Sequence, residues 1–170
     1  MYSYIFLLIT LSGILLSSAD DGSSVDLKTA PINATNTRSI ATYAFESGYK
    51  HYPGVGIIKF HHTLADWNEA REICITEGAH LAVIESAYEE SIISEHQAIN
   101  DIVASWIGLH DQFKRESWVG VMDKQIGYAH WNPGEPNNVG GNERCIEYER
   151  TGYNDLTCSE KRMFICKINL

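Results

Sequence analysis

The chain has 170 residues, which is enough for one domain of ordinary size. Its 13 Lys and Arg residues against 22 Asp and Glu residues give a formal net charge of −9. This acidic balance argues against a protein that binds the phosphate backbone of nucleic acids, and against a polybasic anchor on an anionic membrane. Hydrophobic residues make up 44% of the chain, so a buried core is expected. No Walker A or dinucleotide-type glycine motif follows a strand-like run, so a nucleotide site has no support.

The chain begins with the pattern of a secretory signal peptide. Residues 5–16 form an apolar run of 12 residues, and the small residues Ser17, Ser18 and Ala19 follow it. No Lys or Arg precedes the run, and an N-terminal membrane anchor is the alternative. Because a membrane-spanning helix needs about 20 apolar residues, we expect a signal peptide at residues 1–19. The protein is then secreted and extracellular, with no membrane insertion.

Residues 20–42 are rich in Ser, Thr, Asp and Asn and contain no aromatic residue. Such a segment buries too little apolar surface to offset its ordering entropy. It predicts a flexible leader before a domain at residues 43–170. Asn33 lies in an Asn-Ala-Thr sequon and is a candidate glycosylation site. The leader has no heptad pattern, so any homo-oligomer must form through the domain surface.

The chain contains four cysteines: Cys74, Cys145, Cys158 and Cys166. An even number in a secreted chain favours two disulfides, and the spacing alone does not choose among the three possible pairings. A zinc site would require closely spaced cysteine pairs of the C-x₂₋₄-C type, which are absent. A catalytic thiol would leave one cysteine without a partner.

The first half of the domain predicts a strand at residues 56–60 followed by a helix. Thr63, followed three residues later by Asp66, resembles a helix N-terminus, and Gly78 marks the end of this helix. The apolar residues that recur at helical spacing are Leu64, Trp67, Ala70 and Cys74.

A second helix is expected after a short strand at residues 80–84. Ser86 and Glu89 have the spacing of a capping box. The acidic pair Glu89 and Glu90 is interpreted as a solvated helix face. The predicted buried stripe consists of Tyr88, Ile92, Ile99 and Val103.

Beyond residue 105, short β-like runs alternate with Gly, Asn and Pro. Two helices followed by strands indicate an α+β fold with antiparallel pairing. His61 and His62 are adjacent in a strand-like run, so they point to opposite faces and do not form a joint metal site. The predicted runs are residues 106–109, 118–121, 128–131, 145–148 and 163–166. The tryptophans assigned to the core are Trp67, Trp106, Trp118 and Trp131.

A polar loop at residues 131–142 is punctuated by Gly and Pro. The loop and the residues after it supply three carboxylates and two amide carbonyls, all of them hard oxygen donors. Ca²⁺ takes six to eight such oxygens in proteins, whereas transition metals prefer His or Cys, which this set lacks. The candidate ligands are Glu135, Asn137, Glu143, Asn154 and Asp155.

Several motifs together resemble the C-type lectin domain over residues 60–167. They are Trp106-Ile107-Gly108-Leu109, Glu135-Pro136-Asn137, Glu143 before Cys145, Tyr153-Asn154-Asp155, and the order of the four cysteines. The resemblance implies the pairing Cys74–Cys166 and Cys145–Cys158. It also implies two helices packed on antiparallel sheets with a long calcium-binding loop. The sequence around residues 67–86 is most similar to single-domain invertebrate hemolymph lectins.

The resemblance also implies a binding mechanism. The five candidate ligands would hold one Ca²⁺ and contact two neighbouring hydroxyls of a sugar, with Val139 against the sugar ring. Pro136 is expected in the cis form. The Glu-Pro-Asn order resembles the mannose-type site, which accepts mannose, N-acetylglucosamine and fucose. Auxiliary calcium sites in the family need acids near Arg115, Asn138 and Arg144, so we expect only one calcium.

These expectations predict a secreted, calcium-dependent lectin that binds glycans on microbial or cell surfaces, in innate-immune pattern recognition. The alternative is a calcium-independent protein-binding module of the same fold. An enzyme is disfavoured, because calcium ligation would hold Glu135 and Glu143 ionised and leave no general acid for glycoside hydrolysis. Tyr153 stands where Trp is usual in the family, and we expect little loss from this exchange of aromatic rings.

Overall fold

The computed structural model describes residues 47–170. The predicted signal peptide, the leader with Asn33 and the first residues of the predicted domain lie outside the described residues. The elements in chain order are β1 (Lys50–Tyr52), β2 (Gly56–Ala65), α2 (Trp67–Thr76), β3 (His80–Leu81), α3 (Ala87–Ile99), β4 (Ala104–His110), β5 (Val119–Gly120), the 3₁₀ turn η1 (Val139–Gly141), β6 (Glu143–Glu149), β7 (Gly152–Thr157) and β8 (Arg162–Ile168). No helix within residues 47–170 is long and apolar enough to cross a membrane.

The strands form a single mixed sheet in the order β1-β2-β8-β4-β6-β7, with β3 paired to β8 and β5 to β4. The prediction of antiparallel pairing is wrong for one pair, because β4 and β8 are parallel. The last strand, β8, lies between β2 and β4, which run in opposite directions. It is therefore antiparallel to β2 and parallel to β4.

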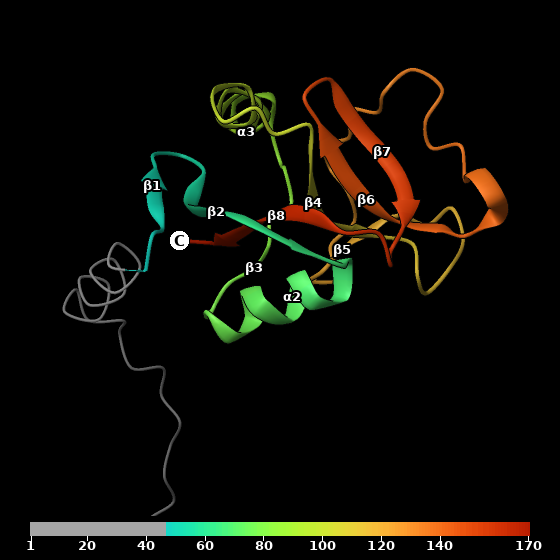
Figure 1. Ribbon diagram of the computed structural model, residues 1–170, viewed down its shortest axis with the longest axis horizontal. Helices are drawn as coiled ribbons and strands as arrows, with labels where there is room; N and C mark the ends of the chain where they lie inside the picture. Colours follow the sequence, from blue (N-terminus) through green and yellow to red (C-terminus); the bar gives the residue numbers. More distant parts are fainter. Residues whose placement is uncertain (1–46) are drawn as a thin grey trace, which may run out of the picture. The chain divides into compact units, whose positions relative to one another are not determined.

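Alternate side chains of the strands supply two hydrophobic clusters. In β2, Ile57 belongs to the first cluster and Ile58 to the second, and in β8 Phe164 and Ile165 divide in the same way. This alternation is the two-residue period of a strand with both faces covered. Figure 1 shows α2 and α3 on opposite sides of β2 and β8. Helix α2 contributes Trp67, Ala70 and Cys74 to the first cluster, and α3 contributes Ile93 to the second.

The first helix begins at Trp67, three residues later than a start at Thr63 would place it. Asp66 is the N-cap: its side chain accepts from the Glu69 backbone N–H at 2.9 Å, and Glu69 accepts from the Asp66 N–H at 3.0 Å. Thr63 and Leu64 continue β2, and Leu64 is 65% exposed. The pairing of Ala65 with Arg162 of β8 extends the strand to the residue before the cap.

The second helix packs with a different face from the one predicted. Ser86 caps it by accepting from the Glu89 backbone N–H at 3.1 Å, but the Glu89 side chain accepts from the Glu85 N–H and does not complete a capping box. Tyr88 is exposed, and so are Ile99 and Val103 beyond it. The buried residues of α3 are Glu89, Glu90, Ile93 and Gln97. The prediction that the acidic pair forms a solvated helix face is therefore wrong, because each carboxylate accepts hydrogen bonds from residues of the sheet side.

The partners of the acidic pair explain why α3 buries this face. Lys167 of β8 donates to both carboxylate oxygens of Glu89, at 2.9 and 3.0 Å. Glu90 accepts from the hydroxyls of Tyr128 and Tyr148 and makes a 2.7 Å contact with His130 Nδ1. Apolar periodicity cannot detect a buried helix face that is built on charge pairing.

The predicted strands are mostly present, with three differences. Residues 128–131 form no strand, and only a single bridge joins Trp131 to Tyr153. In the predicted strand at 80–84, only His80 and Leu81 are regular. Strands β1 and β7 were not predicted at all. The sequence of β7 contains Asn and Asp, which are poor strand formers, and the strand forms because it pairs along β6.

Both disulfides have the pairing that the resemblance implied. Cys74 of α2 is bonded to Cys166 of β8, and Cys145 of β6 is bonded to Cys158, which follows β7. The two bonds use all four cysteines of the sequence, so the zinc and thiol alternatives are excluded.

The Trp-Ile-Gly-Leu run at residues 106–109 has a steric basis. A Cβ on Gly108 would lie 2.4 Å from the carbonyl oxygen of Leu81, so only glycine allows β4 to approach β3 this closely. Trp67 and Trp106 are buried as expected and donate their indole N–H groups to backbone carbonyls. Trp118 and Trp131 are only partly buried and pack against the second cluster.

Candidate functional site

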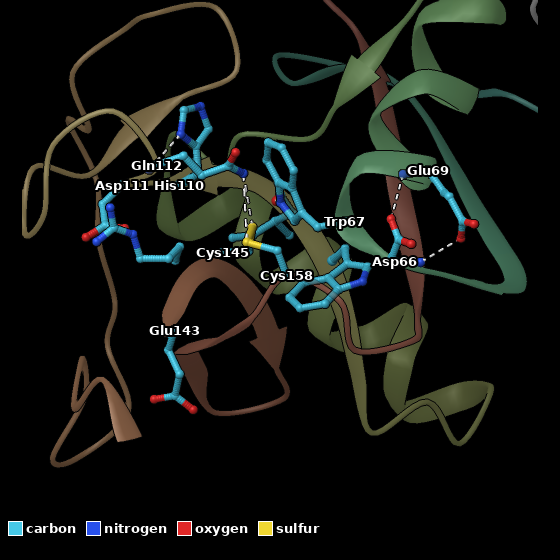
Figure 2. The surroundings of a disulfide bond; sticks show 12 residues. Asp66, Trp67, Glu69, His110, Asp111, Gln112, Glu143, Cys145 and Cys158 are labelled. Carbon is cyan, nitrogen blue, oxygen red and sulfur yellow. Dashed lines mark hydrogen bonds and ion pairs between the residues drawn. A yellow bond between two sulfur atoms is a disulfide. The ribbon is translucent and has the colours of Figure 1, made fainter. Parts of the chain in front are cut away.

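The five predicted ligands lie on three segments that meet beside β7. Glu135 and Asn137 are in the loop at 131–142, and Glu143 is the first residue of β6. Asn154 and Asp155 are in β7, opposite Glu147 and Ile146 of β6. In Figure 2 the Glu143 carboxylate points away from the Cys145–Cys158 disulfide that joins β6 to the end of β7.

The loop is tied to β7 by the side chain of Asp155. The backbone N–H groups of Asn137 and Asn138 each donate to one Asp155 carboxylate oxygen, both at 2.9 Å. Asp155 is only 1% exposed. Asn138 adopts the left-handed conformation, and its side-chain oxygen accepts from the Glu143 N–H at 3.2 Å. One carboxylate thus holds two consecutive peptide groups of the loop in place.

The base of the loop is also fixed to β7, by backbone hydrogen bonds. Tyr153 donates to the His130 carbonyl at 2.7 Å, and Asn132 donates to the Tyr153 carbonyl at 3.0 Å. Gly152 makes this contact possible, because a Cβ there would lie 2.7 Å from the His130 oxygen. Tyr153, which replaces the usual tryptophan, is fully buried.

A chain of hydrogen bonds links the loop ligands to one another. Asn137 Nδ2 donates to Glu135 Oε1 at 2.7 Å, and the Val139 N–H donates to Asn137 Oδ1 at 2.9 Å. The same Val139 N–H also donates to Glu143. The Glu135–Pro136 peptide bond is cis, as expected. The structure therefore brings Glu135, Asn137, Glu143 and Asp155 together, with Asn154 beside Asp155.

Two carboxylates of the site, Glu135 and Glu143, have raised pKa values. Burial raises the pKa of Glu135, and a hydrogen bond and the charge of Asp155 raise it further. Burial also raises the pKa of Glu143, together with the charges of Asp155 and Glu147, against the lowering effect of the Val139 hydrogen bond. Within residues 47–170, no ion pair involves Glu135, Glu143 or Asp155.

This electrostatic pattern fits a hard cation. Glu135 and Glu143 each lie near enough to Asp155 to feel its charge, and none of the three has a basic partner within residues 47–170. Two amide carbonyls complete a set of oxygen donors. Within residues 47–170, three ligating side chains whose ligand atoms all lie within 4.8 Å of one another are found at His61, Glu77 and Cys166, and the loop carboxylates are spaced more widely than this. Cys166 is in a disulfide, so this second cluster does not supply a thiolate ligand.

The two adjacent histidines have separate surroundings. The His61 ring stacks on Phe164 with centroids 4.3 Å apart, and its Nε2 lies 3.1 Å from Glu77. The His62 ring lies near His96 instead, with centroids 5.8 Å apart. The two side chains therefore share no ligand position.

Two of the three positions where a second calcium would need acids carry arginines with partners of their own. Arg115 donates to the Gly141 carbonyl. Arg144 Nε lies 3.0 Å from Asp111 Oδ1, a buried carboxylate whose other oxygen accepts from the Glu116 N–H at 2.7 Å. That this chain binds one calcium stays a prediction.

Two residues near the site, Glu147 and Arg162, were not predicted from the sequence. Asn154 Nδ2 donates to Glu147 Oε1 at 2.9 Å, and Arg162 Nε donates to the other Glu147 oxygen. Glu147 faces Asn154 across the β6–β7 pair. A prediction of β7 as a strand would have placed these two side chains on one face, but the motif that suggested the ligands indicated no strand there.

Comparison with known proteins identifies the family. Residues 63–168 match the profile of the lectin C-type domain. The chain belongs to the C-type lectin family. It is 34% identical to a hemolymph lipopolysaccharide-binding protein of Periplaneta americana, over 72% of this chain and 53% of that protein. It is 36% identical to salivary C-type lectin 2 of Aedes albopictus, over 64% of this chain and 80% of that protein. The chain thus spans about half the length of the cockroach protein.

Solved structures support the same fold. The cow C-type carbohydrate-recognition domain of CD23, solved in the presence of a GlcNAc₂Man₃ oligosaccharide, superposes with a TM-score of 0.66 at 25% identity. The match covers 72% of this chain and 94% of the cow domain. The C-type lectin family is carbohydrate-binding and non-enzymatic, so a glycosidase role for Glu135 and Glu143 is not supported.

Proposed function

We propose that the chain is a secreted, calcium-dependent lectin for mannose-type sugars. The observation that carries the proposal is the convergence of Glu135, Glu143 and Asp155 without a basic side chain among them. A bound Ca²⁺ would neutralise this charge and offer open coordination positions to a ligand. Asn137 and Asn154 would supply the amide oxygens of the same set.

The ligand atoms suit a pair of neighbouring sugar hydroxyls. A hydroxyl both donates and accepts, so it can donate to a carboxylate such as Glu135 while it accepts from an amide N–H such as that of Asn137. Ionised acceptors make these hydrogen bonds stronger than neutral ones. Val139 is 66% exposed on the loop and is available to contact the apolar face of a sugar ring.

The order of donors supports the sugar class. Glu135 precedes the cis proline and Asn137 follows it, which is the Glu-Pro-Asn order of mannose-type sites. On this basis the chain binds mannose, N-acetylglucosamine and fucose. The related domain of cow CD23 was solved with a mannose-containing oligosaccharide present, in line with this assignment.

The relatives suggest a biological setting. A hemolymph lipopolysaccharide-binding protein and a salivary lectin are both similar to this chain. We therefore place the protein outside the cell, where it recognises glycans on microbial or cell surfaces in innate immunity. A single shallow site gives an affinity of about millimolar for one sugar, so useful binding requires several sites on one particle.

Retention on mannose-agarose tests the proposal. The wild-type protein should bind in calcium and elute with EDTA. The Glu135→Gln/Asn137→Asp variant should lose mannose and gain galactose binding, because the amide and the carboxylate exchange places around the proline. Uptake of calcium without retention on any sugar column would contradict the sugar assignment. Failure to take up calcium at all would favour a calcium-independent protein-binding module instead.

A further inference from the structure

The orientation of one side-chain amide decides whether the proposed site can hold a cation. Asn154 must present its carbonyl oxygen Oδ1, because the NH₂ end of an amide cannot ligate a metal. The two ends have nearly the same size, so the orientation is set by hydrogen-bond partners. The present inference rests on the proposed calcium site.

The partner of Asn154 is Glu147. Asn154 Nδ2 donates to Glu147 Oε1 at 2.9 Å, and the Asn154 side chain makes no other hydrogen bond within residues 47–170. Glu147 is only 3% exposed and lies directly opposite Asn154 in the β6–β7 register. Its second oxygen accepts from Arg162 Nε of β8. Three strands thus supply one directed row of hydrogen bonds, in which Arg162 and Asn154 both donate to Glu147.

We infer that Glu147 is a positioning residue that fixes the Asn154 amide with its carbonyl oxygen free for the metal. Arg162 holds the Glu147 carboxylate in the orientation that makes this possible. Only a carboxylate can accept from both neighbours at once, since it has acceptors at both ends. The role differs from that of a ligand, because Glu147 acts through Asn154.

The directionality of the row gives the inference a specific signature. In a Glu147→Gln variant, one end of the side chain accepts and the other donates. Arg162 is always protonated and needs an acceptor, so it takes the glutamine oxygen. The glutamine NH₂ then faces the Asn154 NH₂, and Asn154 turns over to relieve this clash. The NH₂ group of Asn154 would then point at the metal position.

The same reasoning predicts a rescue. Arg162→Met removes the demand for the glutamine oxygen, which becomes free to accept from Asn154 and to restore its orientation. Glu147→Gln should weaken calcium binding by about 10–100-fold, the usual effect of an outer-shell partner. Glu147→Gln/Arg162→Met should return to within about threefold of wild type. Stability also recovers in the double variant, because Arg162 no longer lacks a charged partner. The reversal in calcium affinity is therefore read together with the Asn154 side-chain amide signal, which reports the amide orientation directly.

The experiment measures calcium affinity by isothermal titration calorimetry on the full-length secreted protein. The variants are Glu147→Gln, Arg162→Met and the double variant. Glu77→Gln is the matched control, because Glu77 also accepts from several donors but lies at the C-terminus of α2, among Tyr49, Lys59 and His61. The control should lose stability and keep its calcium affinity. Thermal unfolding in EDTA reports whether each variant is folded.

A second readout needs no calcium. In ¹H–¹⁵N spectra recorded in EDTA, the Asn154 side-chain amide, assigned by its loss in Asn154→Asp, should show one protected proton in the wild type and in the double variant. That protection should disappear in Glu147→Gln. If the wild type takes up no calcium, the proposed function fails. If the wild type binds calcium and Glu147→Gln binds equally well, or if the double variant is no better than the single one, the positioning role is wrong while the calcium site stands.

Discussion

The buried ion pair between α3 and β8 makes a demanding test of the fold. Lys167 Nζ lies 2.9 and 3.0 Å from the two Glu89 oxygens, 3.2 Å from Glu85 Oε2 and 3.4 Å from the Val83 carbonyl. The Lys167 and Glu89 side chains are 1% and 2% exposed. The perturbation is Lys167→Met, which keeps most of the side-chain volume and removes the charge.

The expected loss follows from what remains. Without Lys167, the Glu89 carboxylate stays buried with only the Glu85 N–H at 3.1 Å as a partner. Leaving one charge of a buried pair uncompensated costs about 3–5 kcal/mol in the free energy of unfolding. At about 4 °C per kcal/mol for a domain of this size, the midpoint of thermal unfolding should fall by about 12–20 °C. Lys167→Met/Glu89→Met should recover most of this loss, because no buried charge remains.

Urea and thermal unfolding in EDTA, with the disulfides intact, measure these changes without a contribution from bound calcium. Lys161→Met is the surface control, since Lys161 pairs with Asp66 and Glu69 in exposed positions and should show no resolvable change. A loss below about 1 kcal/mol for Lys167→Met would refute the reasoning. So would a double variant no more stable than the single one.

Three further predictions concern the site and the pH response. Glu135→Gln should abolish calcium uptake in calorimetry. In EDTA at pH 7 it should unfold at the same temperature as wild type or a higher one, because it removes one charge from beside Asp155. A clear fall in that temperature would contradict the charge-repulsion argument. As the pH is lowered, calcium-dependent retention on mannose should begin to fail at a pH above the ordinary glutamate pKa. The reason is that the pKa values of Glu135 and Glu143 are raised, and protonation removes a ligand. Full retention at about pH 4 would contradict this prediction. Burial raises the pKa of Glu77, but hydrogen bonds from Lys59 and Tyr49 outweigh it and leave the pKa below its usual range. The stability that Glu77 contributes is therefore present at neutral pH and is lost as the pH falls through the folded pKa. Wild type and Glu77→Gln should differ in unfolding free energy by about 1 kcal/mol at pH 7, and the difference should disappear as the pH falls below the ordinary glutamate pKa.

The second helix shows where periodicity in the sequence misleads. The predicted apolar stripe was Tyr88, Ile92, Ile99 and Val103, yet Ile92 is only half-buried and the other three are exposed. The helix is rotated because Glu89 and Glu90 have strong partners on the sheet, from β8 and from residues 128–148. Those partners are distant in sequence, so no local pattern reveals them.

The candidate site divides in a similar way. The ligand types and their order could be predicted from the sequence, because Glu-Pro-Asn and Asn-Asp are short continuous motifs. The second disulfide and the contact between the loop and Asp155 bring the two motifs to one place. The positioning pair of Glu147 and Arg162 was not readable, since it depends on the strand register of β7 and on β8 lying between β2 and β4.

The sequence by itself determined the family, the α+β composition, the cysteine framework and the chemical nature of the site, because each of these depends on residue types at short and recognisable spacings. Only the tertiary structure decided which face of α3 is buried, that β4 and β8 run parallel, and which side chain orients Asn154. These outcomes depend on pairs of residues 15 to 78 positions apart, such as Arg162 with Glu147 and Lys167 with Glu89. A hydrogen bond or an ion pair between distant segments is chosen by the packing of the whole domain, and it leaves no periodic signal along the chain.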